Sequence, residues 1–332
     1  MSELNVKGKR VLVTGGCGFI GTNLTKELLA RGAEVAVLDL PAASWDRLPR
    51  GVRAIEADIT DRESLAGKLG GFQLVYHLAA RTDLDGKRLE DYEVNYTGTA
   101  NLLEEAASNG TLERFVFFST QLVVGLFNET RFIDESEPYR TKTPYGRSKI
   151  EGEKVVIAAS REAGVDYTII RPTSVYGPWG GEPYKDFFRA IRNRRYAHIG
   201  RAGNLVSWAY VGNVVDLTIL ASMSDLAKNE TFFASDLHPY TMREIVDTVA
   251  SHYGARVRTV PSVVATVVAY LLGVAKVVGV DVPLYPFRLR NIKMNYCYDI
   301  GRSLRIGHVP ATGLREGVRK TLDWYEENGQ FA

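Results

Sequence analysis

The chain is short of cysteine, and its two cysteines are far apart in the sequence. Cys17 lies inside a glycine-rich turn, where a disulfide bond would obstruct a ligand, and Cys297 lies toward the other end. We therefore expect two free thiols and a reducing, cytoplasmic compartment. A net charge of only +2 gives no indication of nucleic-acid binding.

Other features are also missing. The polar sequence MSELNVKGKR leads straight into a strand, so no signal peptide is expected. The sequence shows no internal repeat and no low-complexity tract, and no metal site is predicted. The 332 residues, 45% hydrophobic and 24% charged, are ordinary for an enzyme of one large domain or two modest ones.

One apolar stretch, residues 261–280, is nearly long enough to span a bilayer. Gly273 and Lys276 interrupt it, and it is rich in small and β-branched residues. We expect a buried or lid-like helix of a substrate-binding region. A helix that lies on a membrane surface or on a partner is the less favoured alternative, and a bilayer span is the least favoured.

The most informative stretch is RVLVTGGCGFIGTNLTKELLARGAEVAVLDL. An apolar strand precedes Gly15, Gly18 and Gly21, and an amphipathic helix and a second strand ending at Asp39 follow. Glycines let the backbone turn tightly and let a pyrophosphate approach the positive end of the helix. The Asp39 carboxylate can accept both ribose hydroxyls and would repel a 2′-phosphate, and residues 40–43 include no Arg. The stretch therefore predicts a mononucleotide-binding unit that prefers NAD to NADP.

Strand-like and helix-like runs alternate from residue 10 to residue 171, which predicts a parallel sheet covered on both faces. The predicted strands are 10–14, 34–39, 53–56, 74–77, 115–119 and 167–171. The predicted helices are 18–31, 61–68, 90–108, 144–162, 185–194, 211–222, 241–253 and 314–327. We predict an α/β, Rossmann-type doubly wound sheet from residues 1–173, to which 210–236 return. A smaller, mainly helical substrate-binding lobe is expected from 174–209 and 237–332.

The expected chemistry centres on Tyr145 and Lys149, which stand four residues apart in a helix-like run and so share one face. Tyrosine is a poor base at neutral pH, but a neighbouring ammonium and a positive nicotinamide ring would lower its pKa. The lysine can also hold the nicotinamide ribose. Thr120 follows the strand FVFFS, at the sheet edge where ligands bind, and its hydroxyl can bond a substrate oxygen.

Further cofactor contacts are expected beyond the ends of other strands. Asp58 and Ile59 are placed to hold the adenine edge. Asn95 is either a cofactor contact or a buried amide that braces the sheet. The residues after LVYH are mostly small, which lets the backbone of this segment lie against a cofactor: Leu78, Ala79 and Ala80.

These motifs resemble those of extended short-chain dehydrogenase/reductases, in the NAD-dependent epimerase/dehydratase group. The matching stretches are TGGCGFIG, LDL, ADI, YHLAA, NYTGT, FFST, YGRSK, RPTSVYGP and GLREGVRKTLDWY, which span nearly the whole chain. The resemblance implies an NAD-dependent enzyme, expected as a homodimer, with Tyr145 as general acid or base and with Lys149 and Thr120 assisting. It adds Phe19, Ile20, Ser119 and Pro172 to the cofactor contacts. It places Arg81, Thr120, Gln121, Ser174 and Tyr184 near the substrate.

At several positions the chain departs from the family pattern, and these departures reduce the number of reactions expected of it. Gln121 and Leu122 stand where sugar 4,6-dehydratases carry an Asp-Glu pair, so dehydration is disfavoured, and UDP-glucuronate decarboxylases carry Glu in place of Leu122. Ser174 and Val206 stand where many nucleotide-sugar members carry the Asn and Arg that bind the diphosphate.

Two substrate classes stay open. A nucleotide-sugar epimerase is favoured by the overall resemblance and by a basic run that either meets phosphates or forms a solvated helix face: Arg189, Arg192, Arg194 and Arg195. The alternative is an oxidoreductase, either a nucleotide 4-keto-sugar reductase or a 3β-hydroxysteroid dehydrogenase-like enzyme of a hydrophobic alcohol. The missing diphosphate contacts, the stretch GNLVSWAYVGNVVD and the apolar segment favour this alternative. A cofactor-sensing scaffold without turnover is disfavoured, because the catalytic set is intact.

Overall fold

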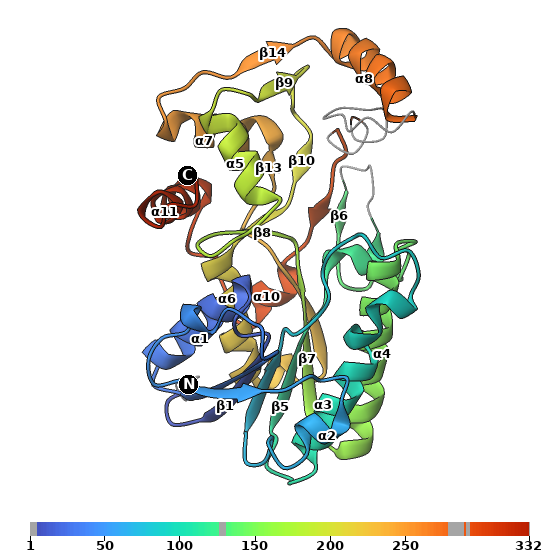
Figure 1. Ribbon diagram of the computed structural model, residues 1–332, viewed down its shortest axis with the longest axis vertical. Coiled ribbons are helices and arrows are strands. Elements are labelled where there is room, and N and C mark those ends of the chain that lie inside the picture. The colour runs from blue at the N-terminus through green and yellow to red at the C-terminus, as the bar shows by residue number, and fades with distance from the viewer. Residues whose placement is uncertain (1–4, 126–130, 278–288, 290–292, 332) are drawn as a thin grey trace.

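The computed structural model describes residues 5–125, 131–277, 289 and 293–331. Its centre is a parallel sheet of seven strands (Figure 1). Across the sheet the order is β12 (Glu230–Ala234), β7 (Asp166–Pro172), β5 (Arg114–Phe118), β4 (Leu74–His77), β1 (Arg10–Thr14), β2 (Glu34–Asp39) and β3 (Arg53–Glu56). The predicted Rossmann-type sheet is confirmed, and each predicted strand is present with its ends shifted by at most one residue.

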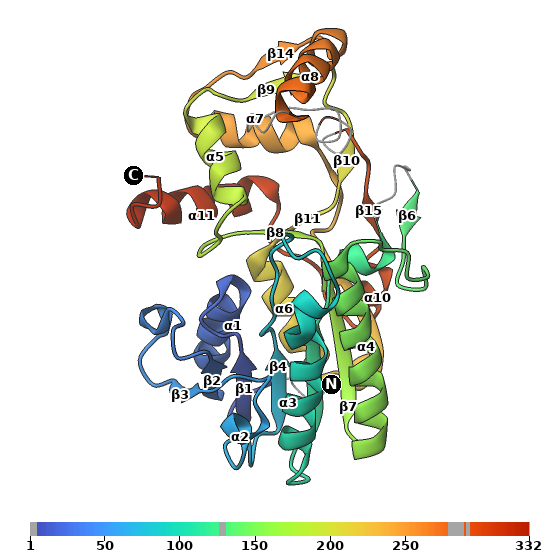
Figure 2. The same ribbon diagram turned by 45° about the vertical axis from the view of Figure 1, so that its right-hand side comes forward.

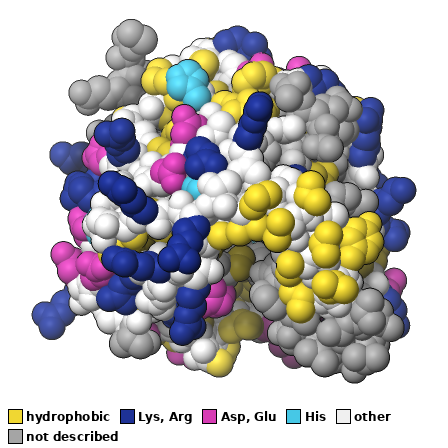
Figure 3. Space-filling model, turned by 90° about the horizontal axis from the view of Figure 1, so that it is seen from above, with side chains coloured by type: hydrophobic (Ala, Val, Ile, Leu, Met, Phe, Trp, Pro, Cys, Tyr) yellow, Lys and Arg dark blue, Asp and Glu magenta, His cyan; other side chains and the backbone are white. Residues whose placement is uncertain are grey.

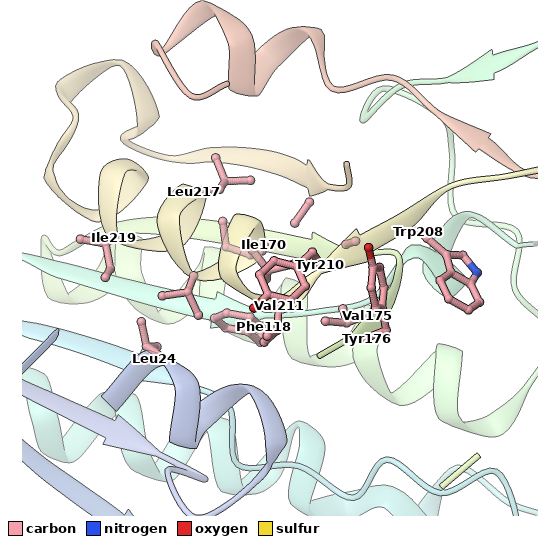
Figure 4. Close-up of a cluster of buried hydrophobic side chains, with 14 of the residues drawn as sticks. Leu24, Phe118, Ile170, Val175, Tyr176, Trp208, Tyr210, Val211, Leu217 and Ile219 are labelled. Atoms are coloured by element: carbon pink, nitrogen blue, oxygen red, sulfur yellow. The ribbon is translucent and has the colours of Figure 1, made fainter. Parts of the chain in front are cut away.

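Helices cover both faces of the sheet, because successive strand residues point to opposite sides. Val11 and Val13 pack under α1 (Phe19–Ala30) and α6 (Val211–Met223). Leu12, between them, packs on the opposite face with α3 (Thr97–Ala107) and α4 (Pro144–Ala163). Figure 4 shows the first of these layers, with Leu24 on α1 and Leu217 and Ile219 on α6.

The second region is a lobe above the carboxyl ends of the strands (Figures 1 and 2). Its helices are α5 (Tyr184–Arg192), α7 (Met242–His252), α8 (Ser262–Val277) and α11 (Leu314–Glu327), and α10 (Gly301–Arg305) lies near the sheet. Its strands form two-stranded pairs: β8 (Ser174–Tyr176) with β11 (Trp208–Tyr210), β9 (Ala197–Ile199) with β14 (Arg258–Val260), β10 (Leu205–Val206) with β13 (Tyr240–Thr241), and β6 (Phe132–Ile133) with β15 (Cys297–Tyr298). The helix predicted over 241–253 is confirmed as α7, and Thr241 and Glu244 form a capping box at its start.

Two predicted helices are wrong in extent. The run 90–108 is interrupted: a 3-10 helix covers Glu90–Asn95, and α3 begins only after Tyr96, whose φ of −129° is not helical. The run 61–68 is reduced to a single turn, α2 (Arg62–Leu65), because Ala66 leaves the helical conformation. Further short 3-10 turns cover Trp45–Arg47, Gln121–Val124 and Asp225–Ala227.

The apolar segment 261–280 forms α8 over its described part, and residues 278–280 lie outside the described residues. We expected a buried or lid-like helix, and of these two the buried helix is wrong. Ala265 and Ala269 are buried, whereas Val263, Val267 and Leu271 are exposed, because only the small residues face the lobe. Among the helices of the described chain, none combines the length and the apolar character needed to cross a bilayer.

Candidate active site

A cavity of about 900 Å³ opens at the carboxyl ends of the strands. It runs past β1 and β4, where the chain reverses its direction of progress across the sheet. Such a switch point is where doubly wound sheets hold ligands, because the loops on its two sides diverge. The glycine-rich turn forms one part of its wall, and the catalytic residues expected from the sequence form another.

The glycine-rich turn has no room for side chains. Gly15 has a φ of +67°, and a Cβ there would lie 2.7 Å from the backbone nitrogen of Ala79. A Cβ on Gly21 would lie 2.2 Å from the carbonyl oxygen of Gly15. Gly18 caps α1, so the unpaired N–H groups of the first helical turn face the cavity. The turn therefore fits the close approach of a pyrophosphate.

Asp39 lies at the end of β2 on the cavity wall. Its carboxylate accepts hydrogen bonds from the backbone N–H groups of Cys17 (3.0 Å) and Leu40 (2.9 Å), which ties the strand end to the glycine turn. A carboxylate held in this way can still accept ribose hydroxyls through its remaining lone pairs. Nearby, Arg47 donates to the carbonyl of Cys17 at 3.3 Å. The sequence reasoning missed this arginine because it searched only the four residues after Asp39.

The phenol of Tyr145 and the hydroxyl of Thr120 lie close to each other at the cavity wall. Thr120 is held by the N–H of Leu122, which donates to its oxygen at 3.2 Å. Burial raises the pKa of Tyr145 to about 12, and the nearby Thr120 hydroxyl acts in the opposite direction. The lowered pKa expected from the sequence is thus not a property of the chain alone. A positive nicotinamide ring beside the phenol would supply the missing stabilisation of the phenolate.

Lys149 lies one turn further along α4 and is 3% exposed. Its ammonium lies 4.4 Å from the centroid of the Phe117 ring. Burial lowers the pKa of Lys149 to about 7, and the carboxylate of Glu153 raises it in part. Below Lys149 the imidazole of His77 is bonded to the hydroxyls of Thr14 and Thr99, and burial lowers the pKa of His77 to about 3. His77 is therefore neutral, and the positive charge in this part of the site is that of Lys149, which is fully present below about pH 7.

A buried ion pair supports the catalytic helix from beneath. The guanidinium of Arg171, on β7, donates to both oxygens of Glu153, on α4, at 2.9 and 2.7 Å. The phenol of Tyr139 donates to the same carboxylate at 2.7 Å. The sequence reasoning missed this network. The sequence could have indicated it, because Tyr145, Lys149 and Glu153 follow one another at intervals of four residues and so share one face of α4.

Most of the predicted site residues line this one cavity. They are Gly15, Gly18, Phe19, Ile20, Gly21, Asp39, Asp58, Ile59, Leu78, Ala79, Ala80, Arg81, Ser119, Thr120, Tyr145, Lys149, Pro172 and Tyr184. Three others are placed elsewhere. Gln121 is buried, and the Ser174 hydroxyl lies near the phenols of Tyr184 and Tyr296. Asn95 accepts from the backbone N–H of Arg81, donates to its carbonyl and donates to Ser148, which fits the expected bracing role, and it does not line the cavity.

Positive charge is scarce at this cavity. Among its described lining residues the cationic side chains are those of Lys149 and Arg81, and Arg81 is bonded to both carboxylate oxygens of Asp83. The basic run expected near the cleft lies elsewhere in the lobe. Arg189 pairs with Asp186, and the guanidinium of Arg192 lies 5.2 Å from the centroid of the Phe331 ring.

The fold and the site together define an NAD-binding α/β enzyme. The turn that a Cβ would fill and the strand-end carboxylate fit the pyrophosphate and adenosine ribose of NAD, and Lys149 fits the second ribose. The chain belongs to the NAD dependent epimerase/dehydratase family, whose model matches residues 11–232.

Individual relatives span the full chain. A 3-beta-hydroxysteroid dehydrogenase of Mycolicibacterium neoaurum is 28% identical over 346 residues, covering 96% of this chain and 92% of its own length. The structure of a Thermus thermophilus UDP-glucose 4-epimerase in complex with NAD is 28% identical, with a TM-score of 0.75 and coverage of 96% and 99%. A dTDP-glucose 4,6-dehydratase from Streptomyces venezuelae, solved with NAD, is 26% identical, with a TM-score of 0.77 and coverage of 97% and 98%.

Proposed function

We propose that this protein is an NAD-dependent oxidoreductase that acts on the carbinol carbon of a largely apolar alcohol. The observation that carries the proposal is the scarcity of free positive charge among the described residues of the cavity. A nucleoside diphosphate brings two negative phosphates, which proteins bind with arginines, helix N-termini or backbone amides. We assign the helix N-terminus at the cavity to the cofactor, and Phe118, Val175 and Tyr184, which also line the cavity, to its substrate end.

Each residue of the site has its own role in the proposed reaction. The hydroxyls of Tyr145 and Thr120 hold the substrate oxygen, and the phenolate of Tyr145 removes its proton during oxidation. Bound NAD supplies the hydride acceptor and, in its oxidised form, a positive ring. Lys149 holds the nicotinamide ribose and stabilises the phenolate with its charge. The pair of Glu153 and Arg171 fixes α4 against β7, so that Tyr145 and Lys149 keep their distance from the sheet.

The curated relatives support the same substrate class. The Mycolicibacterium neoaurum protein named as a 3-beta-hydroxysteroid dehydrogenase matches this chain over nearly its whole length, including the lobe. The family model matches residues 11–232, so most of the lobe, from residue 237 onward, lies outside the matched region. This likeness therefore includes the part of the chain that is expected to bind the substrate.

The second candidate is a nucleotide-sugar epimerase, which the sequence reasoning favoured. The likeness to the Thermus thermophilus UDP-glucose 4-epimerase supports it, because that structure covers 96% of the chain. A nucleotide 4-keto-sugar reductase would need the same phosphate contacts. In either of these two enzymes, Arg81 would have to leave its ion pair with Asp83 in order to bind a substrate phosphate. Homodimerisation and a cytoplasmic location stay predictions.

A ligand panel tests the substrate class. The NAD-loaded Tyr145→Phe variant is heated with a 3β-hydroxysteroid or with UDP-glucose, since a true ligand raises the melting temperature by mass action. The variant retains the pocket but turns over slowly, so binding is measured without product. We expect stabilisation by the steroid alone. Stabilisation by UDP-glucose alone would contradict the proposal and favour the epimerase.

A further inference from the structure

Helix α8 (Ser262–Val277) presents a continuous apolar surface to solvent. Its most exposed side chains are Val263 (75%), Leu271 (68%) and Tyr270 (64%), and between them lie Val264, Val267 and Val268. At about 100° per residue these six side chains occupy roughly 160° of the helix circumference. Single exposed apolar residues are common on soluble proteins, but a continuous face of six is not.

The opposite face of α8 fixes the helix to the lobe. Ala265 and Ala269 are buried against Leu289, and Ile199 of β9 and Val260 of β14 pack on the same cluster. Because these inward-facing helix residues are alanines, α8 lies close to the strand pair and its larger side chains point outward. The helix and the pair β9–β14 therefore form one surface at the end of the lobe farthest from the sheet (Figure 1).

That surface is positively charged. Five exposed arginines come from the β9–β14 pair and its flanks, and none forms an ion pair within the described part of the chain: Arg194, Arg195, Arg201, Arg256 and Arg258. The sequence has no Asp or Glu between Asp186 and Asp216 or between Asp247 and Asp281. The acid that contacts this strand pair is Asp247 of α7, which is bonded to His198 of β9 at 2.8 Å. Figure 3, which looks down on this end, shows hydrophobic side chains gathered on one side and Lys and Arg side chains around and opposite them.

We propose that the α8 surface, defined as the six exposed apolar residues of α8 together with these five arginines, attaches the protein to an anionic lipid membrane. An interfacial helix buries its apolar face among the acyl chains, and neighbouring arginines bind the negative headgroups. A second copy of the chain fits this surface poorly. A two-fold interface would bring the arginines of one copy toward those of the other, with no acid nearby in sequence to neutralise them.

The test is flotation of the full-length protein with vesicles of phosphatidylcholine alone or mixed with phosphatidylglycerol. We expect the protein to bind the mixed vesicles, and added salt to weaken the binding. The variant Val267→Asp/Leu271→Asp should reduce the fraction bound by at least about tenfold. The variant Arg256→Gln/Arg258→Gln should weaken binding by about fivefold per arginine on mixed vesicles.

The matched control is Leu226→Asp/Val309→Asp, which places the same charges on exposed apolar residues outside the α8 surface (70% and 61% exposed). It should bind vesicles as the unchanged protein does. Circular dichroism and NAD binding of every variant show that the fold is intact. Equal binding by the two Asp variants, or no vesicle binding at all, would overturn the proposal. A dimer that only Val267→Asp/Leu271→Asp dissociates would also overturn it, because the occupant would then be a second copy.

Discussion

Replacing Glu153 by Gln tests the buried pair beneath the catalytic helix. The Glu153 and Arg171 side chains are 1% and 5% exposed, and two hydrogen bonds of 2.9 and 2.7 Å join them. Glutamine keeps the shape of the side chain but leaves the Arg171 charge without its partner in a dry site. Removing one member of such a pair costs about 3–5 kcal/mol, so the free energy of unfolding should fall by about that amount.

Urea unfolding of the NAD-free protein measures this loss, with two controls. Glu151→Gln, on the same helix, breaks an exposed pair with Lys154 and should cost at most about 1 kcal/mol. The double variant Glu153→Met/Arg171→Met removes both charges and should recover much of the loss. If Glu153→Gln is within about 1 kcal/mol of the unchanged protein, or if the double variant is no more stable than the single one, the reasoning is refuted.

The same substitution should change how NAD binding depends on pH. The Glu153 carboxylate raises the pKa of Lys149, so its removal lets burial lower that pKa further. NAD affinity should then decline with rising pH at a lower pH than in the unchanged protein. A purely structural role for Glu153 would weaken NAD binding equally at every pH, which isothermal titration across pH distinguishes.

Three further outcomes are expected. Tyr145→Phe should lower turnover by roughly a hundredfold or more and leave NAD affinity unchanged, and a rate near that of the unchanged protein would refute its role as acid and base. Asp39→Ser should weaken NAD binding and strengthen NADP binding with the help of Arg47, and calorimetry showing equal affinity of the unchanged protein for both cofactors would contradict the assignment. Lys149→Met should weaken NAD binding and turnover yet stabilise the NAD-free protein. The gain in melting temperature should be largest near about pH 6, because the buried ammonium of the unchanged protein is charged there. It should shrink as the pH rises from about 7 toward the ordinary pKa of lysine. A gain that did not change with pH would contradict the lowered pKa of Lys149.

Much of the fold follows from local sequence because each βα unit contains its own signals. Apolar runs bounded by turns predict the strands, and Thr241 with Glu244 predicts the start of α7. The glycine turn and Asp39 predict the cofactor side of the cavity for the same reason, since both lie within one such unit. Local signals did not predict the non-helical Tyr96, which interrupts an otherwise helix-like run.

The errors concern properties that depend on distant segments. Arg171 becomes the partner of Glu153 only because β7 lies beneath α4, and Arg47 reaches Cys17 only through the loop after β2. Ser174 is absent from the cavity wall, and its hydroxyl lies near two tyrosine phenols that come from other parts of the chain. The orientation of α8 is set by two alanines, which a hydropathy pattern counts as apolar like their neighbours.

The proposed reaction oxidises or reduces a largely apolar alcohol with net use of the cofactor. The most direct measurement is the amount of NADH formed per substrate converted when the protein is incubated with NAD and a 3β-hydroxysteroid, beside a parallel reaction with UDP-glucose. We expect NADH to accumulate in step with steroid oxidation, Tyr145→Phe to lose that signal, and UDP-glucose not to react. Conversion of UDP-glucose to its epimer without net formation of NADH would contradict the proposal.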